Sequence, residues 1–132
     1  MNRLNKRLTP EGFLIASKLP VRIVLENIRS GLNVGAFFRT GDAMRIAGID
    51  LCGYTARPPH KDILKSALGA SEHVQWNGYE HAPEAVRQLQ EQGYRVAAIE
   101  QSDQSMALSD WAPEAGSQWA FVFGNEVRGV EP

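Results

Sequence analysis

The stretch VRIVLEN, residues 21–27, decides the fold class of this sequence. Its residues are largely apolar and β-branched, which is typical of a strand that is covered on both faces. Four more stretches have strand character: IDLCGYT (49–55), VQWNGY (74–79), YRVAAIE (94–100) and WAFVFG (119–124). Because these strands alternate with helical patterns, the sequence predicts an α/β domain with a mostly parallel five-stranded sheet and helices on both faces.

The first helical pattern follows that strand, in IRSGLNVGAFFRTGDAMRIAG, residues 28–48. Ser30, Gly31 and Asn33 are each able to begin the helix, and Gly48 fits its C-terminal cap. The apolar face that we expect to pack on the sheet consists of Val34, Phe37, Phe38 and Met44.

Two shorter helical patterns lie between the later strands. HKDILKSALGAS (60–71) places four apolar residues on one face, namely Ile63, Leu64, Ala67 and Leu68. APEAVRQLQEQG (82–93) is the clearest helix, with Pro83 near its start and Gly93 as its stop. Its inward positions are predicted to be Ala82, Val86, and Leu89 or Ala85.

The chain has 132 residues, of which 43% are hydrophobic and 22% charged, as expected for one globular domain. We expect residues 1–20 to form an N-terminal arm or short helix, and residues 21–132 to form the domain. No apolar stretch approaches the roughly 20 residues that a membrane-spanning helix needs, and the N-terminus lacks the apolar core of a secretory signal. A cytoplasmic protein with no membrane partner is therefore expected.

Several kinds of site are not indicated. The single cysteine, Cys52, cannot form an internal disulfide, and it is predicted to be a small packed residue and not a nucleophile. The three histidines, His60, His73 and His81, do not form a zinc pair, so no metal is expected. The motifs G-x-G-x-x-G, G-x-x-x-x-G-K-[ST] and G-x-S-x-G are absent, which argues against a nicotinamide cofactor, a P-loop nucleotide and a serine hydrolase.

The net charge of −1 conceals an uneven distribution of charge. Residues 1–66 contain eleven Lys and Arg against five Asp and Glu, a balance of +6, whereas residues 67–132 contain three against ten, a balance of −7. A basic first half offers a face for a polyanion such as RNA. The alternative is that these charges are only solvated, and the count by itself does not separate the two.

Polar residues follow both the first and the last predicted strand. The first strand leads into ENIRSGLNVGAFFRT (26–40), which offers Glu26, Asn27, Asn33 and Arg39, and the last leads into GNEVRG (124–129), which offers Asn125, Glu126 and Arg128. Ligands of parallel sheets bind outside the carboxyl ends of the strands. If these two strands are neighbours, both polar sets face one crevice.

Each of these residues also has a structural interpretation. Arg39 and Asp42 stand three apart on a predicted helix and are able to form a surface pair. Asn33 is able to act only as a helix cap, and Glu126 only to follow a strand.

Two motifs in order carry a family resemblance. NVGAFFRT (33–40) contains Asn33, Gly35-Ala36 and Arg39-Thr40, and FVFGNEVRGV (121–130) contains Gly124-Asn125-Glu126 and Gly129. Together with PPHKDILKSALGA (58–70), they resemble the SpoU/TrmH family of RNA ribose 2′-O-methyltransferases, which belongs to the knotted SPOUT superfamily. The resemblance runs from about Val21 to the end of the chain.

This resemblance implies a site and a reaction, in which S-adenosylmethionine supplies a methyl group to a ribose 2′-hydroxyl. The implied catalytic residues are Arg39, Asn33 and Glu126. The implied cofactor-binding residues are Gly124, Asn125, Glu126 and Gly129, and the implied RNA contacts are Arg39, Arg29 and Arg128. A guanidinium is a poor base because it stays protonated, so Arg39 is better suited to hold an RNA phosphate and stabilise the developing alkoxide.

A third family motif, of the Ser-Leu-Asn type, is not found before Pro132. The resemblance therefore implies a SPOUT-like fold whose C-terminal knot-forming segment is missing, with 21–132 as a C-terminally truncated methyltransferase domain. We expect this fragment to be impaired or inactive, and the full-length protein to be a homodimer. Because about twenty residues precede the first strand, too few for a separate RNA-binding domain, tRNA is favoured over rRNA. A noncatalytic RNA-binding or assembly module is the alternative.

Overall fold

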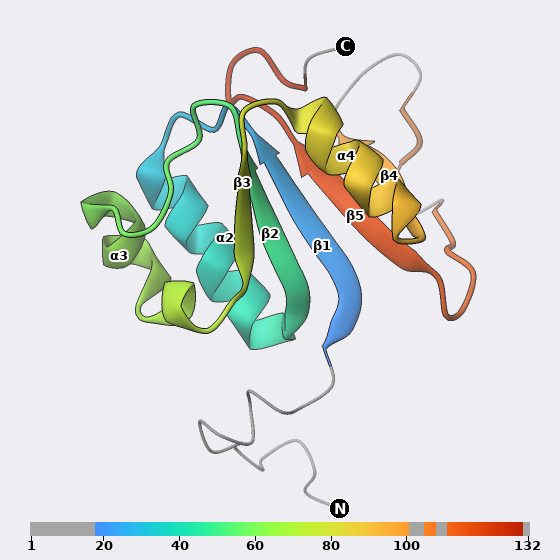
Figure 1. The fold of residues 1–132 in the computed structure, drawn as a ribbon, viewed down its shortest axis with the longest axis horizontal. Helices are drawn as coiled ribbons and strands as arrows, with labels where there is room; N and C mark the ends of the chain where they lie inside the picture. Colours follow the sequence, from blue (N-terminus) through green and yellow to red (C-terminus); the bar gives the residue numbers. More distant parts are fainter. Residues whose placement is uncertain (1–17, 101–104, 108–110, 131–132) are drawn as a thin grey trace, which may run out of the picture.

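The computed structural model describes residues 18–100, 105–107 and 111–130, and within them it contains a five-stranded sheet (Figure 1). The strands lie in the order β3-β2-β1-β5-β4, and every neighbouring pair is parallel. They are β1 (Leu19–Glu26), β2 (Ile46–Cys52), β3 (Trp76–Tyr79), β4 (Tyr94–Ile99) and β5 (Gln118–Phe123). The predicted α/β architecture and all five predicted strands are confirmed, with bounds shifted by up to three residues.

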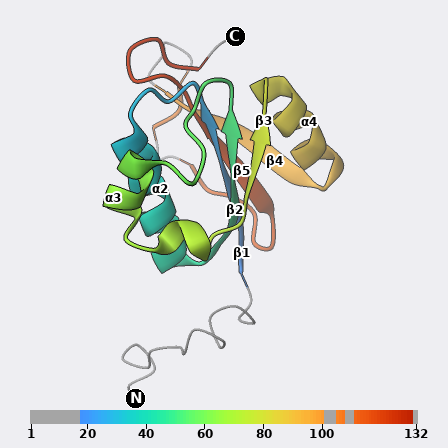
Figure 2. The ribbon, with the colours of Figure 1, turned by 60° about the vertical axis from the view of Figure 1, so that its left-hand side comes forward.

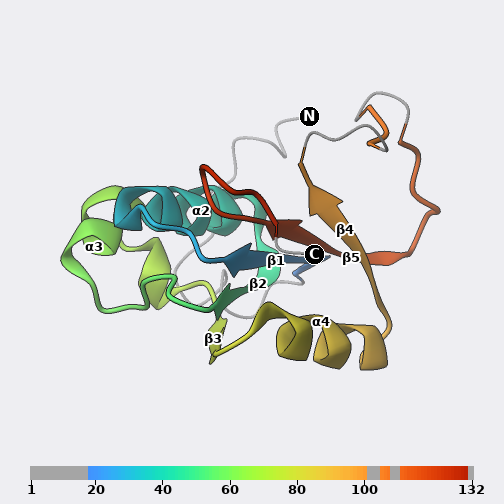
Figure 3. The ribbon, with the colours of Figure 1, turned by 90° about the horizontal axis from the view of Figure 1, so that it is seen from above.

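Helices cover both faces of this sheet, as predicted (Figures 2 and 3). One face carries α2 (Gly31–Met44) and α3 (Lys61–Ala67), followed by a short 3₁₀ helix, Ala70–Glu72. The other face carries α4 (Ala82–Glu91). Among the described residues, no helix is long and apolar enough to cross a membrane.

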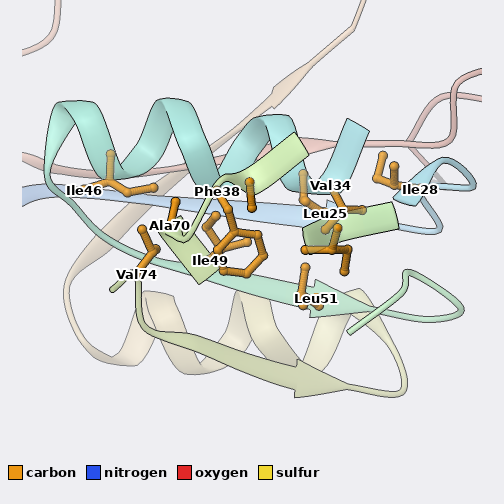
Figure 4. Close-up of a cluster of buried hydrophobic side chains, with 11 residues drawn as sticks. Leu25, Ile28, Val34, Phe38, Ile46, Ile49, Leu51, Ala70 and Val74 are labelled. Carbon is orange, nitrogen blue, oxygen red and sulfur yellow. The ribbon is translucent and has the colours of Figure 1, made fainter. Parts of the chain in front are cut away.

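The side chains of β1 alternate between two cores, which explains the continuous apolar run in that strand. Leu25 points toward α2 and joins the larger core with Val34, Phe38 and Ile49 (Figure 4). Val24, its neighbour in sequence, belongs to the second core, which contains Cys52, Ala82, Ala85, Leu89, Ala120 and Val122. A strand buried on both faces therefore has few polar positions.

Gly48 was predicted to cap the first helix, and this prediction is wrong. The helix ends at Met44, and Arg45 takes the left-handed conformation with φ of 55° while its N–H bonds to the carbonyls of Gly41 and Asp42. Gly48 lies within β2, where a Cβ atom would come within 2.6 Å of the Arg22 guanidinium. That guanidinium passes over Gly48 and donates two hydrogen bonds, at 3.0 and 3.1 Å, to the buried carboxylate of Asp50.

Three predicted inward positions are also wrong. Leu64 and Leu68 of the α3 region are 49% and 63% exposed, and Met44 at the end of α2 is 56% exposed. The seven-residue helix α3 buries only Ile63 and Ala67, because a short helix that packs on α2 has room for one contact row. In α4 the inward residues are Ala82, Ala85 and Leu89, with Val86 partly buried.

Two further predictions are confirmed within the described part of the chain. Gly93 follows α4 with φ of 94°, a conformation that suits glycine at a helix end. Cys52 is fully buried in the second core, as a packed residue. The expected N-terminal arm lies almost wholly outside the described residues, although Leu19 and Pro20 belong to β1.

Candidate functional site

The first and last strands are neighbours, which was the condition for a shared crevice. Leu25 of β1 pairs with Phe123 of β5 in a parallel register. The loop after β1 (27–30) and the loop after β5 (124–129) therefore leave the sheet at the same edge. Figure 1 shows both at the carboxyl end of these strands.

The Glu126 carboxylate connects the two loops. One oxygen accepts a hydrogen bond from the N–H of Arg29 at 2.8 Å. The other accepts from the N–H of Ser30 at 2.9 Å and from Asn33 Nδ2 at 3.2 Å. Partial burial raises the pKa of this carboxyl, but the hydrogen bonds from Arg29, Ser30 and Asn33 outweigh it, so the pKa lies below its ordinary value of 4.5.

Ser30 begins the helix that carries Asn33. The Ser30 hydroxyl oxygen accepts a hydrogen bond from the N–H of Asn33 at 3.1 Å, as the N-cap of α2. Asn33 is therefore not the cap, and its side chain is free to turn toward Glu126. A carboxylate beside the first turn of a helix is also favoured by the helix dipole.

Asn125 organises its own loop. Its Oδ1 accepts from the N–H groups of Val127 and Arg128 at 2.9 and 3.0 Å. Its Nδ2 donates to the Asn27 carbonyl at 2.9 Å and to the Tyr54 hydroxyl at 2.6 Å. The hydrogen-bonding groups of this side-chain amide are thus all satisfied within the protein, so Asn125 stabilises the conformation of the loop.

Gly124 was expected to let a cofactor approach, but the structure gives a different reason for glycine here. The loop closes on itself through two backbone hydrogen bonds between Asn125 and Gly129, at 3.1 and 2.8 Å. A Cβ atom on Gly124 would overlap the backbone of Gly129 and Val130. Glycine is therefore required for the loop to fold back upon its own strand.

Tyr54 and the backbone of Asn27 complete this edge, and sequence patterns did not identify their roles. Asn27 has φ of 53°, and its Oδ1 accepts from the N–H of Tyr54 at 3.1 Å. Asparagine is among the residues that tolerate this left-handed conformation, which is the one signal in the sequence. The partners Tyr54 and Asn125 are 71 residues apart, so no local pattern reveals their contact.

Two cavities share the Asn33 and Glu126 side chains as a wall. The smaller, of about 390 Å³, is largely apolar and includes Phe37 and Phe123. The larger, of about 770 Å³, includes Arg29, Tyr54 and Arg128. The hydrogen-bonded Asn33 and Glu126 pair is therefore reached from two spaces of different chemistry.

Arg39 is not part of this pair's network. It lies exposed on α2, in a neighbouring groove that it shares with Lys65, and among the described residues its guanidinium makes no hydrogen bond or ion pair. The predicted surface pair of Arg39 with Asp42 does not form. Instead, Oδ2 of Asp42 lies 3.5 Å from Nδ1 of His73. The groove shares Ala36 and Thr40 with the smaller cavity, so Arg39 lies next to the cavity that Asn33 and Glu126 line.

Arg29 and Arg128, the other expected RNA contacts, are exposed and line the larger cavity. In residues 18–100, 105–107 and 111–130, no three His, Cys, Asp or Glu residues are grouped to hold a metal ion.

The curated proteins that this chain resembles are named as RNA methyltransferases. The 23S rRNA (guanosine-2′-O-)-methyltransferase RlmB of Neisseria meningitidis serogroup B is 27% identical over 114 residues, which cover 86% of this chain and 44% of that protein. The chain spans less than half the length of the curated relatives that it matches.

Two solved structures show the same fold. The A. aeolicus TrmH/SpoU tRNA modifying enzyme superposes with a TM-score of 0.75 at 18% identity, covering 91% of this chain and 60% of that chain. The AdoMet-bound rRNA methyltransferase from Sinorhizobium meliloti gives 0.77 at 20% identity, covering 96% and 47%. The TrmH/SpoU-type α/β fold that the resemblance implies is thereby confirmed for the part of the chain that superposes.

A family model described as SpoU rRNA Methylase matches residues 20–132, nearly the whole length of the chain. The match includes both polar loops that meet at Glu126. The chain belongs to the SpoU rRNA Methylase family.

Proposed function

We propose that the protein containing this domain transfers a methyl group from S-adenosylmethionine to a ribose 2′-hydroxyl in RNA. The observation that carries this proposal is the contact of Asn33 with Glu126, since it joins the two family motifs at a point that two cavities reach. A transfer between two ligands requires that both reach one point. The RlmB relative, named for guanosine 2′-O-methylation, supports the ribose 2′-oxygen as acceptor.

S-adenosylmethionine, when bound, supplies an electrophilic methyl group on a cationic sulfonium. The loop Gly124 to Gly129 suits such a ligand by its position at the carboxyl edge of a parallel sheet. Gly124 and Glu126 of this loop line the smaller cavity, whereas the Asn125 side chain is already satisfied. We therefore assign cofactor contacts to the backbone of this loop, with Asn125 holding its shape.

Asn33 and Glu126 have distinct tasks in this proposal. Glu126 holds Asn33 Nδ2, which leaves Asn33 Oδ1 without a partner among the described residues. That oxygen is available to accept a hydrogen bond from a ribose hydroxyl and so to orient it. The reaction forms a bond from the 2′-oxygen to the methyl carbon and breaks the carbon–sulfur bond, while the hydroxyl proton passes to an RNA phosphate.

Arg39 serves as the cation beside this point. Because a guanidinium stays protonated, it binds that phosphate and stabilises negative charge that develops on the 2′-oxygen. Its exposed position in the groove next to the smaller cavity is consistent with binding a flexible polyanion from solvent. Arg29 and Arg128 contact further phosphates from the larger cavity.

The test is transfer of a labelled methyl group to separate tRNA and rRNA fractions from cells that lack the gene. Both the 132-residue chain and a version extended through the following coding sequence are assayed, because the match covers only 42% and 44% of the curated relatives. We expect transfer by the extended version and little or none by the shorter one, and we expect tRNA to be the better acceptor. Transfer to neither RNA would overturn the proposal.

A noncatalytic RNA-binding or assembly module is the second candidate, favoured by the excess of basic residues in the first half of the chain. It predicts RNA binding by the extended version without methyl transfer. Binding weakens with salt in both cases, so salt dependence does not separate them. The resemblance also supports a homodimer for the extended version, which sedimentation equilibrium tests.

A further inference from the structure

Tyr54 presents an exposed ring whose position is fixed at two points. The residue is 60% exposed in the loop after β2. Its N–H donates to Asn27 Oδ1 at 3.1 Å, and its hydroxyl accepts from Asn125 Nδ2 at 2.6 Å. The hydrogen bond at the hydroxyl sets the direction of the ring, while its exposure leaves aromatic surface open. Tyr54 is therefore a preorganised aromatic surface outside both cores.

This ring lines the larger cavity together with three kinds of polar group. Arg29 and Arg128 provide two guanidinium groups, and Asn33 and Glu126 provide the wall shared with the smaller cavity. The volume of about 770 Å³ is within the range of ordinary ligand sites.

Each of these groups matches one part of an unstacked nucleotide. Aromatic rings bind bases by stacking, guanidinium groups bind phosphates, and the Asn33 amide is suited to a ribose hydroxyl. Because the groups line one cavity, one nucleotide is able to reach all of them.

We propose that Tyr54 stacks against the base of the nucleotide that becomes methylated and thereby places its ribose at Asn33 and Glu126. This inference rests on the proposed function and names the part of the RNA that the larger cavity holds. Stacking accepts any base, because every base has an aromatic face. Tyr54 then contributes affinity and position, and the choice of base depends on other contacts.

A purely structural role for Tyr54 makes a different prediction. In that case the residue only supports the loop 124–129 through Asn125, and the hydroxyl alone matters. Tyr54→Phe and Tyr54→Leu both remove the hydroxyl, but only the first keeps the ring. The two variants therefore separate stacking from support, and neither alters a core position.

The experiment uses the extended version and a short RNA stem-loop around the nucleotide that methylation mapping identifies. A second RNA is abasic at that nucleotide but keeps its ribose and phosphates. Fluorescence anisotropy gives the affinity of wild type and both variants for each RNA, and methyl transfer is measured in parallel. We expect wild type and Tyr54→Phe to lose roughly 5- to 150-fold in affinity for the abasic RNA, the range for one stacked base. We expect Tyr54→Leu to bind both RNAs equally weakly.

Two results would overturn the role of Tyr54 while wild type still methylates the intact RNA. One is an equal loss of affinity in Tyr54→Phe and Tyr54→Leu, which indicates support alone. The other is an abasic penalty that is unchanged in Tyr54→Leu, which places the base elsewhere. Absence of methyl transfer by wild type would instead overturn the proposed function, and this inference with it.

Discussion

The Glu126 carboxylate lies 3.2 Å from the side-chain amide nitrogen of Asn33, 93 positions earlier in the chain. The same carboxylate accepts the backbone N–H groups of Arg29 and Ser30 at 2.8 and 2.9 Å. One side chain thus fixes the loop after β5 to the start of α2. The two motifs that carry the family resemblance are held together by this contact.

Replacing Glu126 by glutamine should lower the free energy of unfolding by about 1–2 kcal/mol. Glutamine has one acceptor oxygen where the carboxylate uses two, and its amino group would face a backbone N–H. Urea unfolding at neutral pH measures the change. Glu114→Gln is the matched control, since that side chain is 78% exposed and the loss of its Arg95 ion pair should cost less than about 1 kcal/mol. Equal losses in both variants would contradict this role of Glu126.

The stabilising effect of Glu126 should also depend on pH. Its pKa is lowered in the folded protein, because hydrogen bonds outweigh the effect of burial. The contribution of a group with a depressed folded pKa is fully present above its unfolded value, near 4.5, and is lost as pH falls through the folded value. The difference in unfolding free energy between wild type and Glu126→Gln should therefore shrink below pH 4.5. A difference that stays constant down to about pH 3 would be inconsistent with an ionised Glu126.

Gly124→Ala should be among the most damaging single-methyl additions, with a loss of about 2–3 kcal/mol. The added Cβ overlaps the backbone of Gly129 and Val130, which cannot move without opening the loop. Gly41→Ala is the control, because its Cβ would meet side-chain atoms and no backbone, the nearest being Cδ1 of Ile46 at 2.6 Å, and alanine favours the helix. Thermal unfolding compares them, and a Gly124→Ala variant as stable as Gly41→Ala would show that the loop is not closed.

The sequence was sufficient to predict the fold class because its signals are local. A strand such as β1, buried on both faces, shows a continuous apolar run, and its alternation with helices implies parallel strands. The family motifs also directed attention to Asn33 and Glu126, which the structure brings into contact. Their contact depends on the pairing of β1 with β5, which the sequence raised only as a condition.

The remaining errors arise where tertiary contacts override local pattern. The glycine at position 48 fits a helix cap in isolation. In the structure it lies in β2, where the absence of a side chain leaves room for the Arg22 guanidinium to reach the Asp50 carboxylate. Leu64 and Leu68 fit an apolar face, but α3 is too short to bury both rows. The hydrogen bond of Tyr54 to Asn125 joins positions 71 residues apart, beyond any periodicity.

Cys52 should be inert toward thiol reagents in the folded protein. Burial, with the nearby charges of Asp50 and Glu26, raises the pKa of its thiol to about 12, so almost no thiolate exists near pH 8. Reaction with a disulfide reagent at that pH should be negligible before unfolding and stoichiometric in urea. Rapid modification of the native protein would show that the second core opens readily.

Arg39→Ala should strongly lower activity without affecting stability. Its side chain is exposed and forms no ion pair within the described part of the chain. The free energy of unfolding should therefore change by less than about 0.5 kcal/mol. Loss of a cation that stabilises developing charge should lower methyl transfer by the extended version roughly 100- to 1000-fold. Arg87→Ala, exposed on α4 on the opposite face of the sheet, is the control and should retain full activity. Unchanged transfer by Arg39→Ala would remove this residue from the reaction.

If the proposed function is correct, a ribose 2′-oxygen becomes methylated at the point where Asn33 meets Glu126. The most direct measurement is alkaline cleavage of RNA treated with the extended version and S-adenosylmethionine, because cleavage requires a free 2′-hydroxyl. We expect one nucleotide that becomes resistant to alkali with wild type, and full cleavage there with Asn33→Ala. Methyl incorporation that leaves every ribose alkali-sensitive, or resistance that persists in Asn33→Ala, would contradict it.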